Sequence, residues 1–230
     1  MTTEKPLRAD DRPLAETVAA RIRDLLIAGE FAPGEKLSEQ HVADRFGISR
    51  NTLREVYRLL TSQGLLVHIP NRGVFVAAPD EAAVIDIYRV RSVIQKGAIQ
   101  AADKGHPALA RMRMLVEQGQ AASGQDDWQR VGTINMEFHR AMVELCDSPR
   151  LSAGFDLVLA ELRLVFGQLE DTAHLHEPYV GLNLSLVRVL EAGDAAAAVS
   201  QLEAYLHKSE RAVLAALHRK RGRGKQVYDA

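Results

Sequence analysis

The sequence lacks several features that would assign it to particular classes of protein. Its single cysteine, Cys146, cannot form an internal disulfide or a zinc site built on thiolates. It has no run of about 18 apolar residues, which excludes a membrane-spanning helix. Its first 13 residues lack the apolar core of a signal peptide, so we expect a cytoplasmic protein. It contains no G-x-S-x-G, Walker or glycine-rich dinucleotide motif, so no catalytic set stands out.

The charge of the chain is nearly balanced overall but is unevenly distributed. The net charge is −1, which argues against a protein that coats DNA by charge alone. Residues 1–79 have a charge balance of +1, residues 80–218 of −6 and residues 219–230 of +4. The length of 230 residues, 47% of them apolar, is enough for one or two domains with real cores. We expect the three segments to have different partners.

The first third of the sequence has the pattern of three helices followed by a β-hairpin. A polar segment, 1–12, precedes them and is predicted to be a flexible arm. Apolar residues recur at helical spacing after Pro13, and Ser38 and Ser49 are suitable N-caps for the second and third helices. The helices are predicted at 13–28, 39–46 and 49–63, and the hairpin at 65–77, around a turn at Pro70–Gly73. The two later helices are joined by a short glycine turn, which is typical of a helix-turn-helix.

The rest of the sequence is predicted to form an all-α antiparallel bundle, which makes the protein mostly α. The helical stretches fall at 81–103, 107–122, 126–146, 149–171, 178–192 and 195–217. Three of them begin with proline at the first position, namely Pro107, Pro149 and Pro178. The connections are short, so neighbouring helices should run antiparallel. The basic tail, 219–230, is too charged and too rich in glycine to pack, so we expect it to be flexible.

The predicted third helix carries a basic face. Arg50, Arg54 and Arg58 follow each other at i, i+4 and i+8, opposite an apolar stripe. A helix with arginine in its first turns can enter the major groove of DNA, where arginine bonds guanine and Ser, Thr or Asn contact bases or phosphates. The candidate DNA contacts are Arg45, Ser49, Arg50, Asn51, Thr52, Arg54 and Arg58, with Arg72 and Gly73 at the hairpin tip. The alternative is that this basic face only contacts solvent. The sequence disfavours this alternative, because a short helix, a glycine turn, a capped basic helix and a basic hairpin follow one another in order.

Two segments within residues 13–78 carry a family resemblance. They are LLIAGEFAPGEKLSEQHVADRFGISRNTLREVYRLLTSQGLL and PNRGVFV. They are similar to the winged helix-turn-helix of GntR-type bacterial transcription regulators, which implies that double-stranded operator DNA is a partner. The DNA-contacting positions of that family fall on Arg50, Asn51, Thr52 and Arg54, with Arg72 and Gly73 in the wing. The sequence departs from the pattern at Gln40, where many relatives have arginine.

Residues 85–218, which follow a predicted linker at 79–84, resemble the all-helical FCD effector domain of the FadR subfamily. The similar segments are IYRVRSVIQKGAIQAA, NMEFHRAMVELCDSPRL and LVRVLEAGDAAAAVSQLEAYLHKSE. Many FCD domains bind a divalent metal through one Asp and three His. The resemblance puts Asn135, His139, Asn183 and Tyr205 at those positions. Only His139 is a strong ligand, so we expect no bound cofactor. A divalent metal stays an alternative, although most of the family's ligand set is replaced here.

The same positions can instead form a polar effector pocket within an apolar bundle. Arg91, Asn135, His139, Asn183 and Tyr205 would give one cation and several hydrogen-bond donors, which suits a small carboxylate. The resemblance likewise implies that the effector is an organic acid or acyl derivative. The alternative is that His139 and Tyr205 are core residues with satisfied hydrogen bonds and that Arg91 is an interface ion-pair partner.

These patterns together predict a transcription regulator, by resemblance a repressor. One short recognition helix contacts too little DNA for specificity, so we expect a homodimer that binds a palindromic operator. Two alternatives stay open: a constitutive DNA-binding dimer without a ligand, and an enzyme centred on His139. The enzyme would need another strong acid, base or ligand near His139, and the sequence does not show one.

Overall fold

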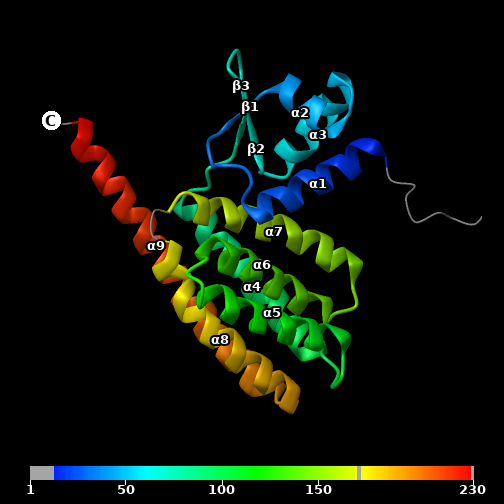
Figure 1. Ribbon diagram of the computed structural model, residues 1–230, viewed down its shortest axis with the longest axis vertical. Helices are drawn as coiled ribbons and strands as arrows, with labels where there is room; N and C mark the ends of the chain where they lie inside the picture. The colour runs from blue at the N-terminus through cyan, green and yellow to red at the C-terminus, as the bar shows by residue number, and fades with distance from the viewer. Residues whose placement is uncertain (1–12, 170–171, 229–230) are drawn as a thin grey trace, which may run out of the picture.

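The structure, a computed structural model, describes residues 13–169 and 172–228, with side chains for 13–169, 173 and 175–220. A small winged part lies at one end and a helical bundle forms the rest of the molecule (Figure 1). This confirms the predicted fold class. The arm predicted at 1–12 lies outside the described residues. No helix of the described part is long and apolar enough to cross a membrane.

The winged part contains three helices and a three-stranded antiparallel sheet. Its elements are α1 (Leu14–Ala28), β1 (Lys36–Leu37), α2 (Glu39–Phe46), α3 (Arg50–Ser62), β2 (Leu66–Ile69) and β3 (Gly73–Val76). The strand order is β1-β3-β2, so β3 is central. The sequence prediction lacked β1, which pairs with β3 through Lys36↔Phe75 and Leu37↔Val74. The β2–β3 hairpin forms the wing.

Local capping and burial fix the orientation of α3. Its predicted core face is buried throughout, at Leu53, Val56, Tyr57 and Leu60. The Ser38 and Ser49 hydroxyls accept hydrogen bonds from backbone N–H groups in the first turns of α2 and α3. Gly47 ends α2 with a left-handed φ of 64°, where a side chain would be strained. The turn between α2 and α3 is therefore held at both ends, and the arginine face of α3 points to solvent.

The bundle is built around one central helix. Its elements are α4 (Glu81–Ala101), α5 (Pro107–Ser123), α6 (Trp128–Glu144), α7 (Pro149–Gly167), α8 (Thr172–Ala192) and α9 (Ala195–Tyr228). The central helix is α6, which packs against α4, α5, α7 and α8, while α9 packs on α4 and α8 (Figure 1). Pro107 and Pro149 are at the first turns of their helices, as predicted.

Three helix boundaries differ from the sequence prediction. Helix α8 begins at Thr172, so Pro178 lies inside it rather than at its start. Buried side chains on both sides of the proline, Leu175 and Tyr179, keep this segment packed as a helix despite the lost hydrogen bond. Helix α7 ends at Gly167, four residues before the predicted end at 171. Helix α4 begins at Glu81 as predicted, capped by the Asp80 carboxylate, so the linker predicted at 79–84 overlaps its first turn.

The third difference concerns the basic tail. Helix α9 continues to Tyr228, so residues 219–228 are helical rather than an unstructured tail. The lysines, arginines and glutamine of this segment are good helix formers, and each of its two glycines costs only about 1 kcal/mol in a helix. A charged composition therefore did not prevent helix formation.

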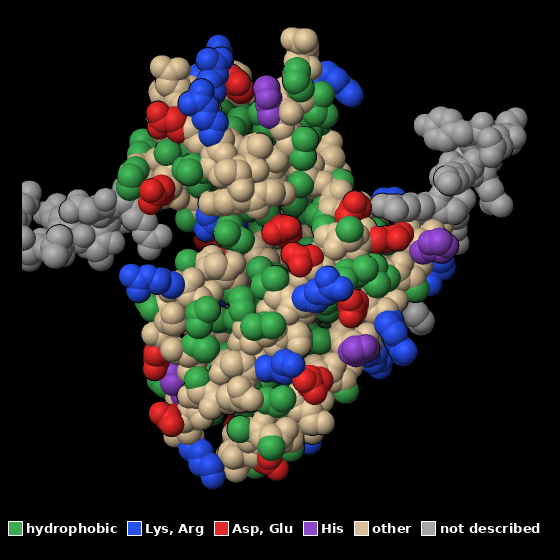
Figure 2. Space-filling view, turned by 180° about the vertical axis from the view of Figure 1, so that it is seen from behind, with side chains coloured by type: hydrophobic (Ala, Val, Ile, Leu, Met, Phe, Trp, Pro, Cys, Tyr) green, Lys and Arg blue, Asp and Glu red, His purple; other side chains and the backbone are tan. Residues whose placement is uncertain are grey.

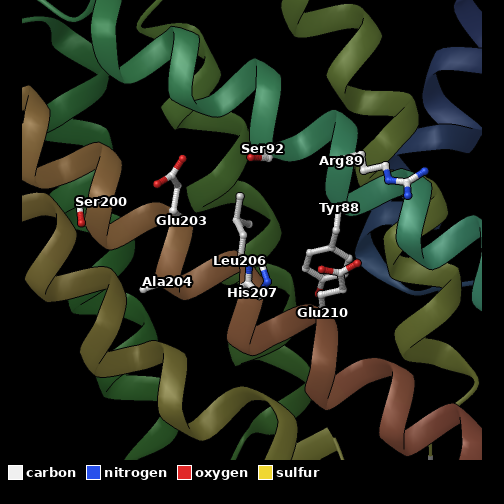
Figure 3. A pocket seen from close by; sticks show the side chains of 9 residues that line it. All are labelled: Tyr88, Arg89, Ser92, Ser200, Glu203, Ala204, Leu206, His207 and Glu210. Carbon is white, nitrogen blue, oxygen red and sulfur yellow. The ribbon is translucent and has the colours of Figure 1, made fainter.

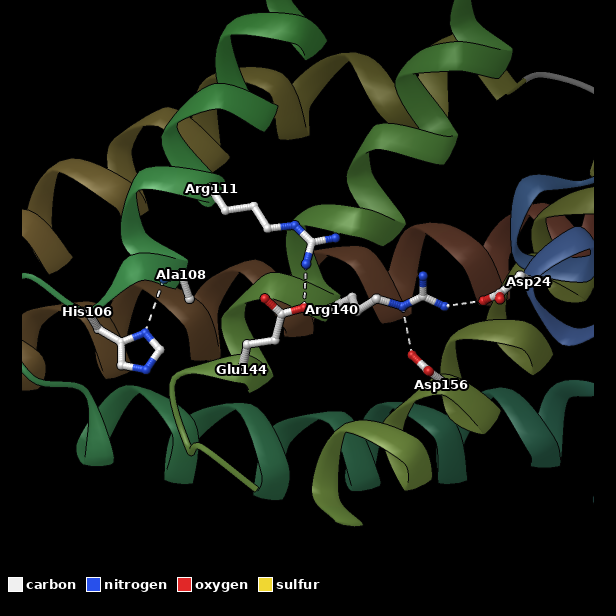
Figure 4. A network of polar contacts seen from close by, with 7 residues as sticks. All are labelled: Asp24, His106, Ala108, Arg111, Arg140, Glu144 and Asp156. Carbon is white, nitrogen blue, oxygen red and sulfur yellow. Dashed lines mark hydrogen bonds and ion pairs between the residues drawn. The ribbon is translucent and has the colours of Figure 1, made fainter. Parts of the chain in front are cut away.

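An ion-pair cluster joins the winged part to the bundle. Arg140 on α6 donates from Nη2 to Asp24 Oδ1 on α1 at 3.0 Å and from Nε to Asp156 Oδ1 on α7 at 2.7 Å (Figure 4). Further along α1, the Ala28 carbonyl accepts from Arg163 Nη2 at 3.4 Å. Helix α6 thus carries His139 on its buried side and, at the next residue, the arginine that holds α1.

Candidate DNA-binding surface and effector site

The predicted DNA-contacting residues all belong to the winged part, where they lie on α2, on α3, in the turn between these helices and at the tip of the β2–β3 hairpin. Lys and Arg side chains gather there in the space-filling view (Figure 2). Thr52 and Gly73 are partly buried, and the other seven are exposed: Arg45, Ser49, Arg50, Asn51, Arg54, Arg58 and Arg72. A groove of about 560 Å³ lies between α3 and the wing, with Arg54, Arg58 and Gly73 among its lining residues. The structure thus places the helix and the wing on one continuous surface.

The arginines of α3 are held by partners that DNA can replace. Arg54 pairs with Glu39 at 3.4 Å, with side chains 61% and 39% exposed. Arg50 donates to the Gln40 side chain, which also donates to Asp44 at 2.8 Å. Exposed pairs of this kind contribute only about 0–1 kcal/mol, so phosphate or guanine can displace them at little cost. Gln40, the departure from the family pattern, positions Arg50.

Two predicted contacts have structural roles in the free protein. Ser49 caps α3 and its hydroxyl lies 2.9 Å from that of Thr52. Arg45 pairs with Glu30 at 2.5 Å and lies over the ring of Phe31. Arg45 therefore ties α2 to the loop after α1, on the side that leads toward the bundle.

The predicted effector residues come together as a buried polar cluster. Their exposed fractions are 0% for His139, 1% for Arg91, 3% for Tyr205, 7% for Asn183 and 9% for Asn135. Arg91 lies with its guanidinium over the Tyr88 ring, 4.8 Å from the centroid. Among the described residues, no carboxylate lies within ion-pair distance of Arg91. The described residues therefore give no support to the interface ion-pair role considered from the sequence.

A directed chain of hydrogen bonds links four members of the cluster through an additional residue, Gln95. Gln95 Nε2 donates to His139 Nδ1 at 2.7 Å, so the histidine proton lies on Nε2. That nitrogen donates to the Tyr205 hydroxyl at 3.0 Å, and the hydroxyl donates to Asn135 Oδ1 at 3.1 Å. Asn183 Nδ2 donates to the same oxygen at 2.8 Å. The bonds from Gln95 through His139 and Tyr205 run in one direction and end at Asn135 Oδ1, which also accepts the bond from Asn183, and this order fixes one arrangement of the cluster.

Burial keeps this cluster uncharged apart from Arg91. Burial, and then the nearby Arg91 guanidinium, hold the pKa of His139 well below 6.5. Burial raises the pKa of Tyr205 above its usual value. Three buried polar atoms of the cluster have no hydrogen-bond partner among the described residues: Arg91 Nε, Gln95 Oε1 and Asn183 Oδ1. These atoms are what the cluster could offer to a ligand.

The cluster does not fit a divalent metal. Both ring nitrogens of His139 are used by Gln95 and Tyr205, and the other members are carboxamides, a phenol and a cation. Within residues 13–169 and 172–228, no three His, Cys, Asp or Glu side chains approach closely enough to share a metal ion. The alternative of a metal at His139 is therefore not supported by the donor set.

A surface groove of about 610 Å³ lies beside the cluster, between α4 and α9 (Figure 3). Its walls carry both charges, with Arg89 from α4 and Glu203 and Glu210 from α9. Tyr88 also lines this groove, and the same ring contacts Arg91 in the interior. The Tyr88 hydroxyl lies 2.6 Å from that of Ser209 on α9. Tyr88 therefore separates the groove from the buried arginine.

Sequence reasoning missed several residues that the structure brings together. Gln95 is not among the candidate residues that the sequence indicates, although it bonds His139 directly. His176 is a second such residue, because it lies on α8 and is only 2% exposed. The side chain of His174 lies outside the described residues. Leu175, His176 and Tyr179 at i, i+1 and i+4 gave a helical signal that Pro178 obscured.

Comparisons with known proteins agree with this architecture. A family model described as "Bacterial regulatory proteins, gntR family" matches residues 14–76, and a model of the FCD domain matches residues 86–208. A solved GntR transcriptional regulator from Rhodococcus sp. RHA1 is 33% identical, with a TM-score of 0.80 over 88% of this chain and 98% of that one. The chain therefore belongs to the gntR family of bacterial regulatory proteins, and its helical bundle is an FCD domain.

Curated relatives are more distant. The uncharacterized HTH-type transcriptional regulator YdhC of Bacillus subtilis (strain 168) is 25% identical over 135 residues, which cover 57% of this chain and 60% of YdhC. A Paenarthrobacter nicotinovorans protein named "Probable D-xylose utilization operon transcriptional repressor" is 25% identical over 189 residues, 77% of this chain and 80% of that protein. The chain spans 53–61% of the length of the first three curated relatives it matches. These proteins are transcriptional regulators and not enzymes, which removes the alternative of an enzyme centred on His139.

Proposed function

We propose that the protein is a repressor of the FadR subfamily that binds a specific operator as a homodimer. The observation that carries this proposal is the exposed face of α3, where Arg50, Arg54 and Arg58 project beside the wing. Arginine side chains at the start of such a helix can bond guanine in the major groove, while Arg72 and the Gly73 backbone contact the adjacent backbone or minor groove. The similarity to a protein named a repressor supports the sign of regulation.

Selection of operator DNA tests this proposal. Genomic fragments bound by the purified chain are sequenced, and the complex is analysed by sedimentation. We expect an inverted repeat with half-sites about one helical turn apart, bound by two chains. Binding that follows DNA length rather than sequence, or a single chain on the operator, would contradict it.

We propose further that the FCD domain binds a small organic acid or acyl derivative in the cluster around His139. Arg91 supports this, because it is a buried cation without a carboxylate partner among the described residues. A carboxylate could accept from Arg91 and displace the Tyr88 ring, which lies between the cation and the surface groove. Since α6 carries both His139 and Arg140, a shift of α6 on binding would reach Asp24 on α1.

A constitutive dimer without ligand is the second candidate function. The observation that favours it is the hydrogen-bond chain from Gln95 to Asn183, which links the polar side chains of the core to one another without any guest. Thermal unfolding with a panel of organic acids, sugar acids and acyl-CoAs separates the two candidates. A melting temperature that rises with one acid, and does so less in Arg91→Met, supports an effector. No rise with any of them leaves the constitutive dimer.

A further inference from the structure

A second pocket lies where the winged part meets the bundle. It has a volume of about 430 Å³ and is lined on one side by the loop 29–35, which follows α1. The other side comes from α6, α7 and α8 through Trp128, Arg163 and His176. The pocket is separate from the cluster around His139. None of the predicted DNA contacts lines it, but Arg45 pairs with Glu30 in its wall. An occupant would touch both parts of the molecule at once.

Glycines make room for the cation of this pocket. A Cβ atom on Gly132 of α6 would lie 2.7 Å from Arg163 Nη1 and 2.8 Å from His176 Nε2. A Cβ atom on Gly29, where α1 ends with a φ of +83°, would lie 2.5 Å from Arg163 Nη2. The guanidinium and the imidazole therefore converge in a space that exists only because both positions lack a side chain. A larger residue at either position would displace the guanidinium.

The cation of this pocket is poorly neutralised. Among the described residues, Arg163 has no carboxylate within ion-pair distance, and its bonds to the Ala28 carbonyl and the Thr133 hydroxyl are long, at 3.4 and 3.5 Å. Two acids line the pocket, but Glu30 pairs with Arg45 and Glu35 accepts from the Ala32 N–H. Burial lowers the pKa of Arg163 below its usual value. The pocket thus has a half-buried positive charge without an anionic partner among the residues that the structure describes.

The histidine beside it is also incompletely bonded. His176 is 2% exposed, and its Nδ1 has no hydrogen-bond partner in the described part of the chain. Burial, and then the positive charge of Arg163, lower the pKa of His176 to about 4, so the ring is neutral near pH 7. A neutral imidazole has one N–H to donate, and Nε2 lies beside the guanidinium. The two groups together offer several donors to one anionic guest.

The remaining walls are largely aromatic. Phe166 packs against the His176 ring with centroids 4.9 Å apart. Phe31 from the loop and Trp128 from the start of α6 also line the pocket. Flat apolar walls around a single cation suit a ring that carries one carboxylate, because the ring stacks while the carboxylate bonds the guanidinium.

We propose that this junction pocket is a binding site for a small aromatic carboxylate, which bonds Arg163 and His176 and stacks on the aromatic side chains. The ligand contacts the loop after α1 and the ends of α6 and α7, so it binds best when the winged part is in the orientation seen here. Its binding free energy is therefore linked to the orientation of the DNA-binding surface. The site is additional to the proposed effector cluster.

Trp128 is the only tryptophan of the chain, so its fluorescence reports directly on this pocket. The full chain is titrated with benzoate, with benzyl alcohol and with inorganic phosphate. We expect a saturable change in Trp128 fluorescence with benzoate. Benzyl alcohol, which has the ring but no charge, and phosphate, which has the charge but no ring, should both bind much more weakly. Isothermal calorimetry confirms one site per chain.

Three variants locate the binding. Arg163→Gln should weaken benzoate binding about 10- to 100-fold, as expected for loss of a charged hydrogen-bond pair. Gly132→Ala, which keeps the helix and displaces the guanidinium, should weaken it in the same direction. Arg130→Gln is the matched control, because Arg130 is an exposed arginine of the same helix, and it should leave the affinity unchanged. Thermal unfolding of each variant verifies that it is folded.

Three results would overturn the proposal. They are that benzoate shows no saturable binding, that it binds the Arg163→Gln variant as tightly as the wild type, or that phosphate binds as tightly as benzoate. Loss of binding in a folded Arg91→Met variant but not in Arg163→Gln would place the carboxylate in the cluster around His139. That result would support the proposed effector site while removing the junction site, so the two proposals fail separately.

Discussion

Removing one hydroxyl, that of Tyr205, tests the hydrogen-bond chain at the centre of the FCD domain. The hydroxyl accepts from His139 Nε2 at 3.0 Å and donates to Asn135 Oδ1 at 3.1 Å. In Tyr205→Phe, Asn135 keeps its bond from Asn183, but the His139 N–H loses its acceptor inside a core with no exposed surface. One buried donor is therefore left unsatisfied.

The size of the effect follows from that orphaned donor. An unsatisfied buried polar group costs about 1–3 kcal/mol, which exceeds the small net value of a satisfied neutral hydrogen bond. For a chain of this length, each kcal/mol lowers the melting temperature by about 2–4 °C. We therefore expect Tyr205→Phe to lower the melting temperature by several degrees.

The chain provides a matched control for this experiment. Tyr57 is 4% exposed, and its hydroxyl is buried without a hydrogen-bond partner. Tyr57→Phe removes the same atom but strands no other group, so we expect it to be neutral or slightly stabilising. Thermal unfolding by circular dichroism compares the two variants. Equal effects of the two substitutions, or a neutral Tyr205→Phe, would refute the directed chain.

Three further predictions concern the junction, the buried histidines and the recognition helix. Arg140→Met should lower the free energy of unfolding by about 1.5–3 kcal/mol, because it removes two charged hydrogen bonds. Asp24→Asn should lower it by under about 1 kcal/mol, because the Asp24 side chain is 61% exposed. Urea unfolding that ranks the two variants in the reverse order would count against the junction geometry. The pKa of His139 lies well below 6.5 and that of His176 is about 4, so the unfolded chain binds protons below pH 6.5 that the folded chain does not. The free energy of unfolding should therefore fall as the pH drops from 6.5 toward 4, by up to about 1.4 kcal/mol per pH unit for each histidine. His176→Phe should make this dependence shallower. If urea unfolding across this pH range gives the same slope for the variant as for the wild type, the burial of His176 is contradicted. Ser49→Ala removes the cap of α3 and should cost about 1 kcal/mol of stability, with Ser62→Ala near the end of the same helix as the control; equal losses would argue against the cap.

Features that depend on local sequence could be predicted. The apolar stripe of α3 predicts its buried face, and Ser38, Ser49 and the glycine turns predict where α2 and α3 begin and end. These signals lie within one or two turns of chain, so residue spacing and backbone preferences determine them. The arginine face of α3 follows from the same periodicity, because a helix with one buried side exposes the other.

Features that depend on contacts between distant segments could not be predicted. Gln95 and His139 are 44 residues apart and meet only because α4 packs on α6. Arg163 and His176 meet at a space left by Gly132, which no spacing within α7 or α8 shows. The two-residue strand β1 exists because β3 offers it a partner, not because its own sequence favours a strand.

The central claim, that α3 with its exposed arginines recognises the operator, is tested most directly by fluorescence anisotropy on the selected operator. The assay compares the wild type with Arg50→Ala, Arg54→Ala and the double variant. The control is Arg130→Ala, which removes an exposed arginine of the bundle. Each single substitution should cost about 1–3 kcal/mol, roughly a 5- to 150-fold loss of affinity, and the Arg130 control should bind normally. Full operator affinity in a folded Arg50→Ala, Arg54→Ala double variant would contradict the account.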